Sequence, residues 1–392
     1  MRSMIGWITS ALLWAAAFTA AAQESPIIIG AVVSQTGSHA AAAADYRKAL
    51  LLWQDQTNAQ GGLLGRRVEL RIADDSSEAA RAGREYAQLI SGGAQLFIGP
   101  YGSAATLAGA AEAERARRIM LNAAGPSGQV HKRAPRYLFQ SAAPYTAYAD
   151  GILSIAQHAQ LRTLFVAGRD DVASREIAEA VQAQAQKLGF RVQLEMYPAA
   201  TVDFLPLVYK AMGAHAEAWI AFGDARDAAD MIKTFKRQGY VPRLFYARAS
   251  TDPRFIALVG QDAELVLGSK EYDARFSTAG NRTFAQAFMA KWNVAPGPSA
   301  AAGYAAASVL AEAVRRAGTV DSEKLRNVLA SLDLDTVLGR YRVDPANGAQ
   351  VGIKPAVMQI VRGRSQPVWP ETLAGDRSAL AFAPWSERQL LR

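Results

Sequence analysis

The chain has 392 residues, with 43 Lys and Arg against 35 Asp and Glu, and it contains no cysteine. The missing cysteine excludes disulfides, thiolate metal sites and a cysteine nucleophile. The formal net charge of +8 comes from scattered basic pairs without a dense basic patch. We therefore expect no nucleic-acid partner, and the charge favours solubility.

The first residues have the organisation of a cleaved signal peptide. Arg2 supplies a basic start, residues 5–18 a short apolar core, and residues 20–22 a small-residue cleavage site. Cleavage after Ala22 leaves 370 of the 392 residues, which is long for one core and favours two domains. Because the new N-terminus has no cysteine to be lipidated, we expect a free periplasmic protein rather than a lipoprotein.

From Pro26 onward, apolar strands alternate with amphipathic helices. Strands are predicted at 27–33, 68–73, 96–99 and 119–121, and helices at about 40–58 and 78–90. Such βαβ repetition predicts a parallel sheet covered by helices on both faces.

A second alternating pattern follows a loop-rich passage at 122–145. Strands are predicted at 163–167, 192–196, 218–222 and 244–247, and a long helix at 300–317. Near the end, strands at 339–343 and 356–361 are expected to be joined by a turn at 344–348. Two α/β sheets create a cleft at the carboxyl ends of their strands. The loops at 34–38, 74–77, 100–103, 122–127, 168–171, 223–226 and 248–251 are therefore expected to carry the ligand contacts.

The run from Leu96 to Thr106 is the most informative motif. A strand stops at Gly99-Pro100, and an alanine-rich helix begins at Ser103. The first N–H groups of a helix lack internal partners and lie at the positive end of its dipole, so with a hydroxyl they suit a carboxylate. Taken alone, the motif also fits an ordinary capped helix.

No residue pattern favours catalysis. The four histidines lack the spacing of a metal pair, and the His215-Ala216-Glu217 motif lacks the cysteines of a zinc deaminase. The Asp74-Asp75 and Asp170-Asp171 pairs follow strands, where carboxylates usually cap helices or turns. We therefore predict a protein without enzymatic activity, metal or cofactor.

Several motifs in order resemble one family. They are Gln35–Gly37, Asn58–Arg66, Asp74-Asp75, Ile98–Ser103, Tyr137–Pro144, Pro367–Pro370 and Pro384-Trp385. The chain resembles the periplasmic substrate-binding proteins of branched-chain amino acid ABC transporters, the leucine/isoleucine/valine-binding type. The resemblance implies a type I periplasmic-binding-protein fold, with two Rossmann-like lobes joined by a three-strand hinge. It places residues 27–142 and 272–340 in lobe one, and 143–271 and 341–392 in lobe two.

The resemblance also implies the binding residues. Ser103, with Ala124 and Ser127 in the loop at 122–127, would hold a ligand carboxylate. Tyr101, Tyr145 and Tyr148 are candidates for the cleft wall, although a core or hinge role fits each of them equally.

Lobe two departs from the family. Arg248 takes the position of the glutamate that meets the ammonium of an amino acid; the alternative is a solvated loop residue. A guanidinium repels an ammonium, so an organic or aromatic acid is the preferred ligand. Ala42, Ala173 and Ala225 stand near aromatic positions of the family, which predicts a roomier cavity unless alanine is simply abundant.

These observations predict a monomer that delivers a small carboxylate-bearing ligand to the permease subunits of an ABC importer. The alternative is a periplasmic ligand-sensing receptor subunit of the same fold. A third possibility is an enzyme whose site has no recognised motif.

Overall fold

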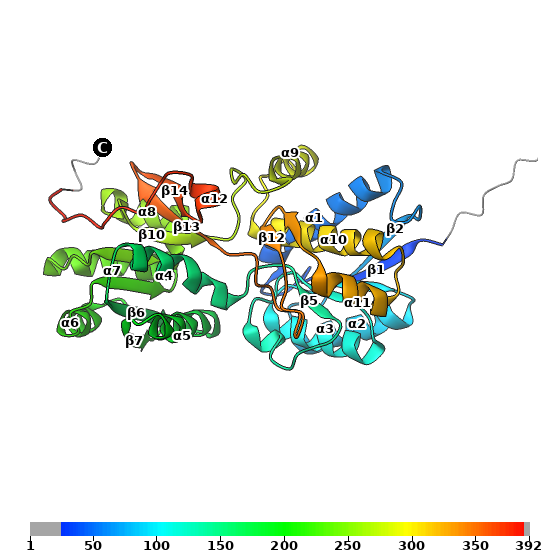
Figure 1. The fold of residues 1–392 in the computed structure, drawn as a ribbon, viewed down its shortest axis with the longest axis horizontal. Helices are drawn as coiled ribbons and strands as arrows, with labels where there is room; N and C mark the ends of the chain where they lie inside the picture. Colours follow the sequence, from blue (N-terminus) through cyan, green and yellow to red (C-terminus); the bar gives the residue numbers. More distant parts are fainter. Residues whose placement is uncertain (1–24, 388–392) are drawn as a thin grey trace, which may run out of the picture.

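The first sheet of the computed structural model, which describes residues 25–387, has five parallel strands (Figure 1). The strands are β1 (Ile27–Val32), β2 (Val68–Ala73), β3 (Leu96–Ile98), β4 (Met120–Asn122) and β5 (Leu138–Gln140). Their order in the sheet is β2-β1-β3-β4-β5. The central strands β1 and β3 are almost entirely buried, which explains their continuous apolar sequences.

Helices cover both faces of this sheet, as the alternating pattern predicts. They are α1 (Ala40–Ala59), α2 (Ala79–Ser91), α3 (Ser103–Ala116), α10 (Pro298–Ala317) and α11 (Ser322–Ser331), while α9 (Asn281–Trp292) packs on α1 and α10. Helices α1, α10 and α11 share one core with the sheet, whereas α2 and α3 pack on the opposite face. Tyr46 of α1 is fully buried and donates a hydrogen bond of 2.6 Å to the carbonyl of Gly99, just before the loop into α3.

The second sheet has seven strands in the order β14-β13-β10-β9-β8-β6-β7. They are β6 (Thr163–Arg169), β7 (Arg191–Tyr197), β8 (Ala218–Phe222), β9 (Leu244–Ala247), β10 (Leu267–Lys270), β13 (Ala356–Val361) and β14 (Arg364–Trp369). The strands from β7 to β10 are parallel, and β13 and β14 add an antiparallel edge.

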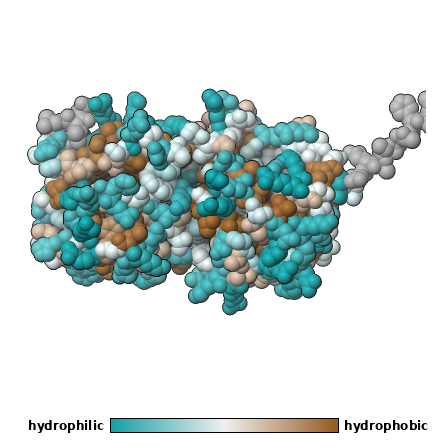
Figure 2. Space-filling model, in the orientation of Figure 1, coloured by the Kyte–Doolittle hydropathy of each residue, from teal (hydrophilic) through white to brown (hydrophobic). Residues whose placement is uncertain are grey.

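Two groups of helices sandwich the second sheet. They are α4 (Tyr148–His158) and α5 (Val172–Lys187) on one face, and α6 (Leu205–Gly213), α7 (Ala225–Gln238) and α8 (Pro253–Val259) on the other. The short helix α12 (Glu371–Ala374) follows β14, and 3₁₀ turns lie at η1 (Gly128–Val130), η2 (Tyr145–Ala147), η3 (Arg248–Thr251) and η4 (Gly260–Ala263). Hydrophilic residues cover most of the face shown in Figure 2, over both lobes, because the apolar residues fill these cores.

The chain passes between the lobes three times, after β5, after β10 and before β13 (Figure 1). The strands predicted at 339–343 and 356–361 both exist, and so does the turn at 344–348, but the prediction that this turn joins the two strands is wrong: it closes on an antiparallel bridge between Val343 and Gln350. Strand β12 (Gly339–Tyr341) pairs with β11 (Leu334–Thr336), and β13 belongs to the other sheet. The residues in between are needed to span the two lobes.

The third crossing lies later in the chain than the predicted boundary at residue 340. Tyr341 and Val343 are buried in the core of the first lobe, and the amide of Gln140 donates to the carbonyl of Gly348 at 2.8 Å. The start of the predicted second segment of lobe two therefore packs on the first sheet. The predicted signal peptide, residues 1–22, lies outside the described residues. Between residues 25 and 387, none of the helices combines the length and apolar character that crossing a membrane requires.

Candidate functional site

The turn from β3 into α3 leaves the start of that helix open. Tyr101 forms a bridge with Ala124, and the amide of Gly102 donates to the carbonyl of Ala124 at 2.9 Å. Gly102 has a φ of 95°, a conformation that favours glycine, and no side chain caps the helix that begins at Ser103. The first N–H groups of α3 and the Ser103 hydroxyl are consequently available to an anion.

The neighbouring loop at 122–127 is held rigidly beside Ser103. The side chain of Asn122 accepts from the amide of Gly125 at 2.9 Å and donates to its carbonyl at 2.8 Å. The amide of Ser127 donates to Ser103 Oγ at 3.1 Å. Because the Ser103 oxygen is already an acceptor, its hydrogen is free to point at a ligand oxygen.

A buried histidine fixes this loop from behind. His131 Nε2 lies 3.3 Å from Asn122 Nδ2, and Nδ1 lies 2.9 Å from the carbonyl oxygen of Asn347. Asn122 can only donate through Nδ2, so the ring carries its proton on Nδ1 and is neutral. Burial lowers the pKa of His131, against the smaller opposing effect of the Asn347 carbonyl.

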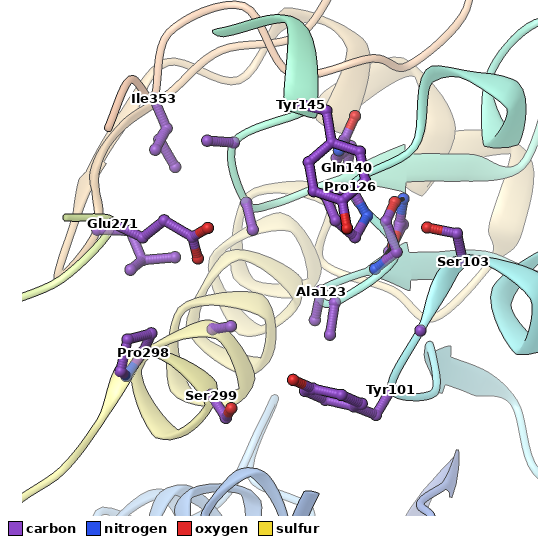
Figure 3. A pocket seen from close by; sticks show the side chains of 18 of the residues that line it. Tyr101, Ser103, Ala123, Pro126, Gln140, Tyr145, Glu271, Pro298, Ser299 and Ile353 are labelled. Carbon is purple, nitrogen blue, oxygen red and sulfur yellow. Dashed lines mark hydrogen bonds between the residues drawn. The ribbon is translucent and has the colours of Figure 1, made fainter. Parts of the chain in front are cut away.

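A cavity of about 390 Å³ lies between the lobes, in front of Ser103. This volume falls in the range of about 300–1,000 Å³ that is typical of small-molecule sites. The first lobe contributes His39, Tyr101, Ser103, the loop 122–126, Gln140 and Ser299. Ser299 lies in the first turn of α10, so a second helix begins at the cavity. In Figure 3, Ser103 and Glu271 lie on opposite sides of the cavity, with Tyr145 and Pro126 between them.

The second lobe contributes two opposite charges. Arg248 follows β9 directly and Glu271 follows β10 directly, so the neighbouring strands bring both residues to the same edge. Within residues 25–387, Glu271 is the only acidic residue that lines the cavity and Arg248 the only Lys or Arg. The guanidinium lies 5.8 Å from the ring centroid of Tyr148, whose hydroxyl donates to Glu271 Oε1.

Tyr148 and Arg248 each have a well-defined protonation state. Burial, reinforced by the Glu271 carboxylate, raises the pKa of Tyr148 well above its ordinary value, so the phenol remains a donor. Burial by itself would lower the pKa of Arg248, but Tyr148, Tyr246 and Glu271 outweigh it and raise that pKa. The guanidinium is therefore always charged, although its Nε is buried without a hydrogen-bond partner among the described residues.

A carboxylate links the lobes at the rim. Glu176 of α5 accepts from Ser127 Oγ at 2.7 Å and from the amide of Gly128 at 2.6 Å. Ser127 caps η1 on the first lobe, and Gly128 is the first residue of η1. Glu176 therefore holds the two lobes together beside the cavity.

Five of the seven predicted site residues line one cavity: Tyr101, Ser103, Ala124, Tyr145 and Arg248. Ser127 and Tyr148 are not in the lining that the described residues form; their hydroxyls donate to Glu176 and Glu271. Sequence reasoning missed Glu271 and Ser299. The signal for Ser299 was available, since Gly297-Pro298-Ser299 opens the alanine-rich helix α10 much as Gly99-Pro100 leads into α3.

Other predicted contacts lie elsewhere. Asp74 accepts from the amide of Gln35 at 2.8 Å, and Asp75 accepts from Ser34 Oγ at 2.7 Å, so these loops bind each other. Asp171 caps α5, as expected for a carboxylate after a strand. In the part of the chain that the structure describes, Ala42, Ala173 and Ala225 do not line the cavity. The prediction that these three alanines enlarge the cavity is therefore wrong. Nor do residues 25–387 contain three or more His, Asp or Glu residues grouped as metal ligands.

The comparisons with known proteins agree with this geometry. A family model described as periplasmic binding protein matches residues 26–365, and the chain therefore belongs to that family. This confirms the predicted resemblance and the predicted class, a binding protein rather than an enzyme.

Individual relatives are distant. The chain is 23% identical to an amino acid binding protein of Pseudomonas aeruginosa, over 83% of this chain and 88% of the relative. An ABC transporter substrate-binding protein of Desulfitobacterium hafniense in complex with leucine has a TM-score of 0.72 at 21% identity, covering 88% of this chain and 100% of that structure. A solute-binding protein of Rhodopseudomonas palustris in complex with 3,4-dihydroxybenzoic acid has a TM-score of 0.67 at 19% identity, with coverages of 87% and 95%. These structures confirm the predicted two-lobe α/β fold.

Proposed function

We propose that this chain is a periplasmic substrate-binding protein that delivers a small organic acid, preferably an aromatic one, to an ABC importer. The observation that carries the proposal is the cavity between the lobes, lined by the open start of α3 at Ser103 from the first lobe and by Arg248 from the second. Family membership and the predicted signal peptide support a periplasmic location.

The charges around the cavity argue against an α-amino acid. Its ammonium is two bonds from the carboxylate carbon, so it stays near Ser103 when the carboxylate is bound there. Among the described residues, the only acidic residue of the lining is Glu271, which lies on the opposite side (Figure 3). An ammonium at the Ser103 end thus loses its hydration without gaining an anionic partner, which is costly.

The relatives include precedents for both ligand classes. The Desulfitobacterium structure contains leucine, and the Rhodopseudomonas structure contains 3,4-dihydroxybenzoic acid. The fold therefore accommodates either class, and the polar groups of the cavity must decide between them.

Titration calorimetry with matched ligand pairs tests the proposal. Leucine is compared with 4-methylpentanoate, and phenylalanine with 3-phenylpropanoate, so that only the amino group differs within a pair. We expect the des-amino acid of each pair to bind more tightly, and Ser103→Ala to weaken the binding of both acids. A ligand at about 100 times its Kd should raise the free energy of unfolding by about 2.7 kcal/mol, which allows a preliminary thermal-shift screen.

Two outcomes would contradict the proposal. Tight leucine binding without a response to the acids would identify an amino acid binder. The second is acid binding without transport. If the protein binds the acid and supports no uptake in proteoliposomes by a permease encoded beside its gene, but activates a sensor kinase encoded there, it is the receptor subunit instead.

A further inference from the structure

The second lobe adds one positive and one negative group to the wall of the cavity. Arg248 and Glu271 follow adjacent strands of the second sheet, and both line the cavity. Their formal charges cancel, yet no ion pair within 4.0 Å joins the two side chains in the described structure. Both charged residues therefore line the cavity without being bound directly to each other.

Both groups have unused hydrogen-bonding capacity. Arg248 Nε is buried and has no hydrogen-bond partner within residues 25–387. Glu271 Oε1 accepts from Tyr148, and its other oxygen, Oε2, has no hydrogen-bond partner among the same residues. Figure 3 shows the Glu271 carboxylate directed into the cavity. A ligand can therefore find both a donor and an acceptor at this end.

The paired charges restrict the chemistry of the group that a ligand places there. A second carboxylate is attracted by Arg248 but repelled by Glu271, and an ammonium meets the reverse situation. An apolar group leaves both buried charges without a partner. A hydroxyl or a primary carboxamide accepts from the guanidinium and donates to the carboxylate, so it satisfies both without a net charge.

We propose that Arg248 and Glu271 select monocarboxylates whose remote end carries a neutral group that both donates and accepts a hydrogen bond. This inference rests on the proposed function, because it assumes that the ligand carboxylate lies at Ser103. A guanidinium alone would favour an anionic or carbonyl group at this end, and the nearby Glu271 carboxylate removes the preference for an anion.

The test uses para-substituted benzoates and the corresponding 3-phenylpropanoates, so that two spacings are sampled. The para substituents are hydroxyl, methyl, carboxylate and aminomethyl, and affinities are measured by titration calorimetry. In the wild type we expect the better-fitting hydroxyl acid to bind about 10- to 100-fold more tightly than its methyl analogue, the usual effect of hydrogen bonds to charged groups. Both charged analogues should bind more weakly than the hydroxyl acid.

Two variants separate the two charges. Glu271→Gln keeps the size of the side chain and an acceptor for Tyr148 but removes the negative charge near Arg248. The affinity for the dicarboxylate should therefore rise about tenfold or more. Arg248→Met keeps the length of the side chain but removes the positive charge near Glu271, so the affinity for the aminomethyl acid should rise instead. The control is Glu195→Gln on β7, where the carboxylate pairs with Lys210 at 2.7 Å, outside the cavity lining. Glu195→Gln should leave the ranking of the para-substituted acids by affinity unchanged.

The outcomes distinguish this inference from the proposed function. If the acids bind and Ser103→Ala weakens all of them, but the para substituent makes no difference, only the inference is overturned. The same holds if Glu271→Gln folds with an unchanged melting temperature and the dicarboxylate gains nothing. If no acid of either series binds to the folded wild type, both proposals are overturned.

Discussion

Removing the carboxylate of Glu176 should weaken ligand binding without touching the ligand. Glu176 accepts two hydrogen bonds from the other lobe, from Ser127 Oγ and from the amide of Gly128. These bonds exist only while the lobes are together, so Glu176→Ala lowers the stability of the closed form relative to the open form. The closed form surrounds the ligand, and its loss reduces affinity.

The size of the effect follows from the two bonds. Hydrogen bonds to charged groups contribute about 1.5–3 kcal/mol each when shielded from water. Glu176 is half-buried and Gly128 is exposed, so solvent screening reduces the sum. We expect Glu176→Ala to destabilise the closed form relative to the open form by about 1–2 kcal/mol in total, which raises Kd about 5- to 30-fold.

The assay is titration calorimetry with the tightest-binding acid, together with small-angle scattering of the unliganded protein. Glu176→Ala should raise Kd and increase the radius of gyration. The control is Glu179→Ala on the same helix, since the Glu179 side chain is 57% exposed and its nearest ionic partner, Arg175, is 3.7 Å away. Equal effects of the two substitutions, or a Kd of Glu176→Ala within twofold of the wild type, would refute the reasoning.

Two further predictions concern the loop behind Ser103. Because burial lowers the pKa of His131, the unfolded chain takes up a proton near pH 6.5 that the folded protein resists. This contribution to stability is complete above about pH 6.5 and is lost as the pH falls toward the lowered pKa, by at most about 1.4 kcal/mol per pH unit. Denaturant titrations at pH 7.5 and 5.5 should show a smaller loss in the free energy of unfolding for His131→Gln than for the wild type or for the exposed control His158→Gln. Equal losses in the three proteins would contradict this role of His131. Gly125→Ala would place a methyl group 2.5 Å from Thr106 Oγ1 and 2.9 Å from Asn122 Oδ1, so it should lower the free energy of unfolding by about 1–3 kcal/mol. Gly213→Ala, with no heavy atom within 4 Å, should have little effect, and equal melting temperatures for the two variants would show that the loop accommodates the methyl group.

Much of the fold could be predicted because its signals are local. Strands such as β1 and β8 are continuous apolar runs, and the open start of α3 is visible in the turn before Ser103. Strand β5 was overlooked because it is three residues long and lies inside a loop-rich passage. Strand β10, Leu-Gly-Ser-Lys, has no apolar pattern of its own and is recognisable only by its neighbours in the sheet.

The candidate site was predictable only in part, for the same reason. Ser103 and Arg248 each follow a recognisable strand, whereas Glu271 follows β10 and was missed with it. The link from Ser127 to Glu176 joins residues 49 positions apart, on different lobes. Such a contact depends on how the lobes meet, and the periodicity of either segment contains no information about that.

The unequal shares of the two lobes in the cavity have a kinetic consequence. The open start of α3, the loop at 122–126 and Ser299 all belong to the first lobe, while the second lobe adds Arg248 and Glu271. An arriving ligand can settle on the first lobe alone and exchange rapidly with solvent until the second lobe swings over it. Substitutions at Ser103 should then alter association and dissociation together. Substitutions at Arg248 or Glu271 should act mainly on the dissociation rate. The residence time in turn determines what fraction of the ligand is still bound when the protein reaches the membrane.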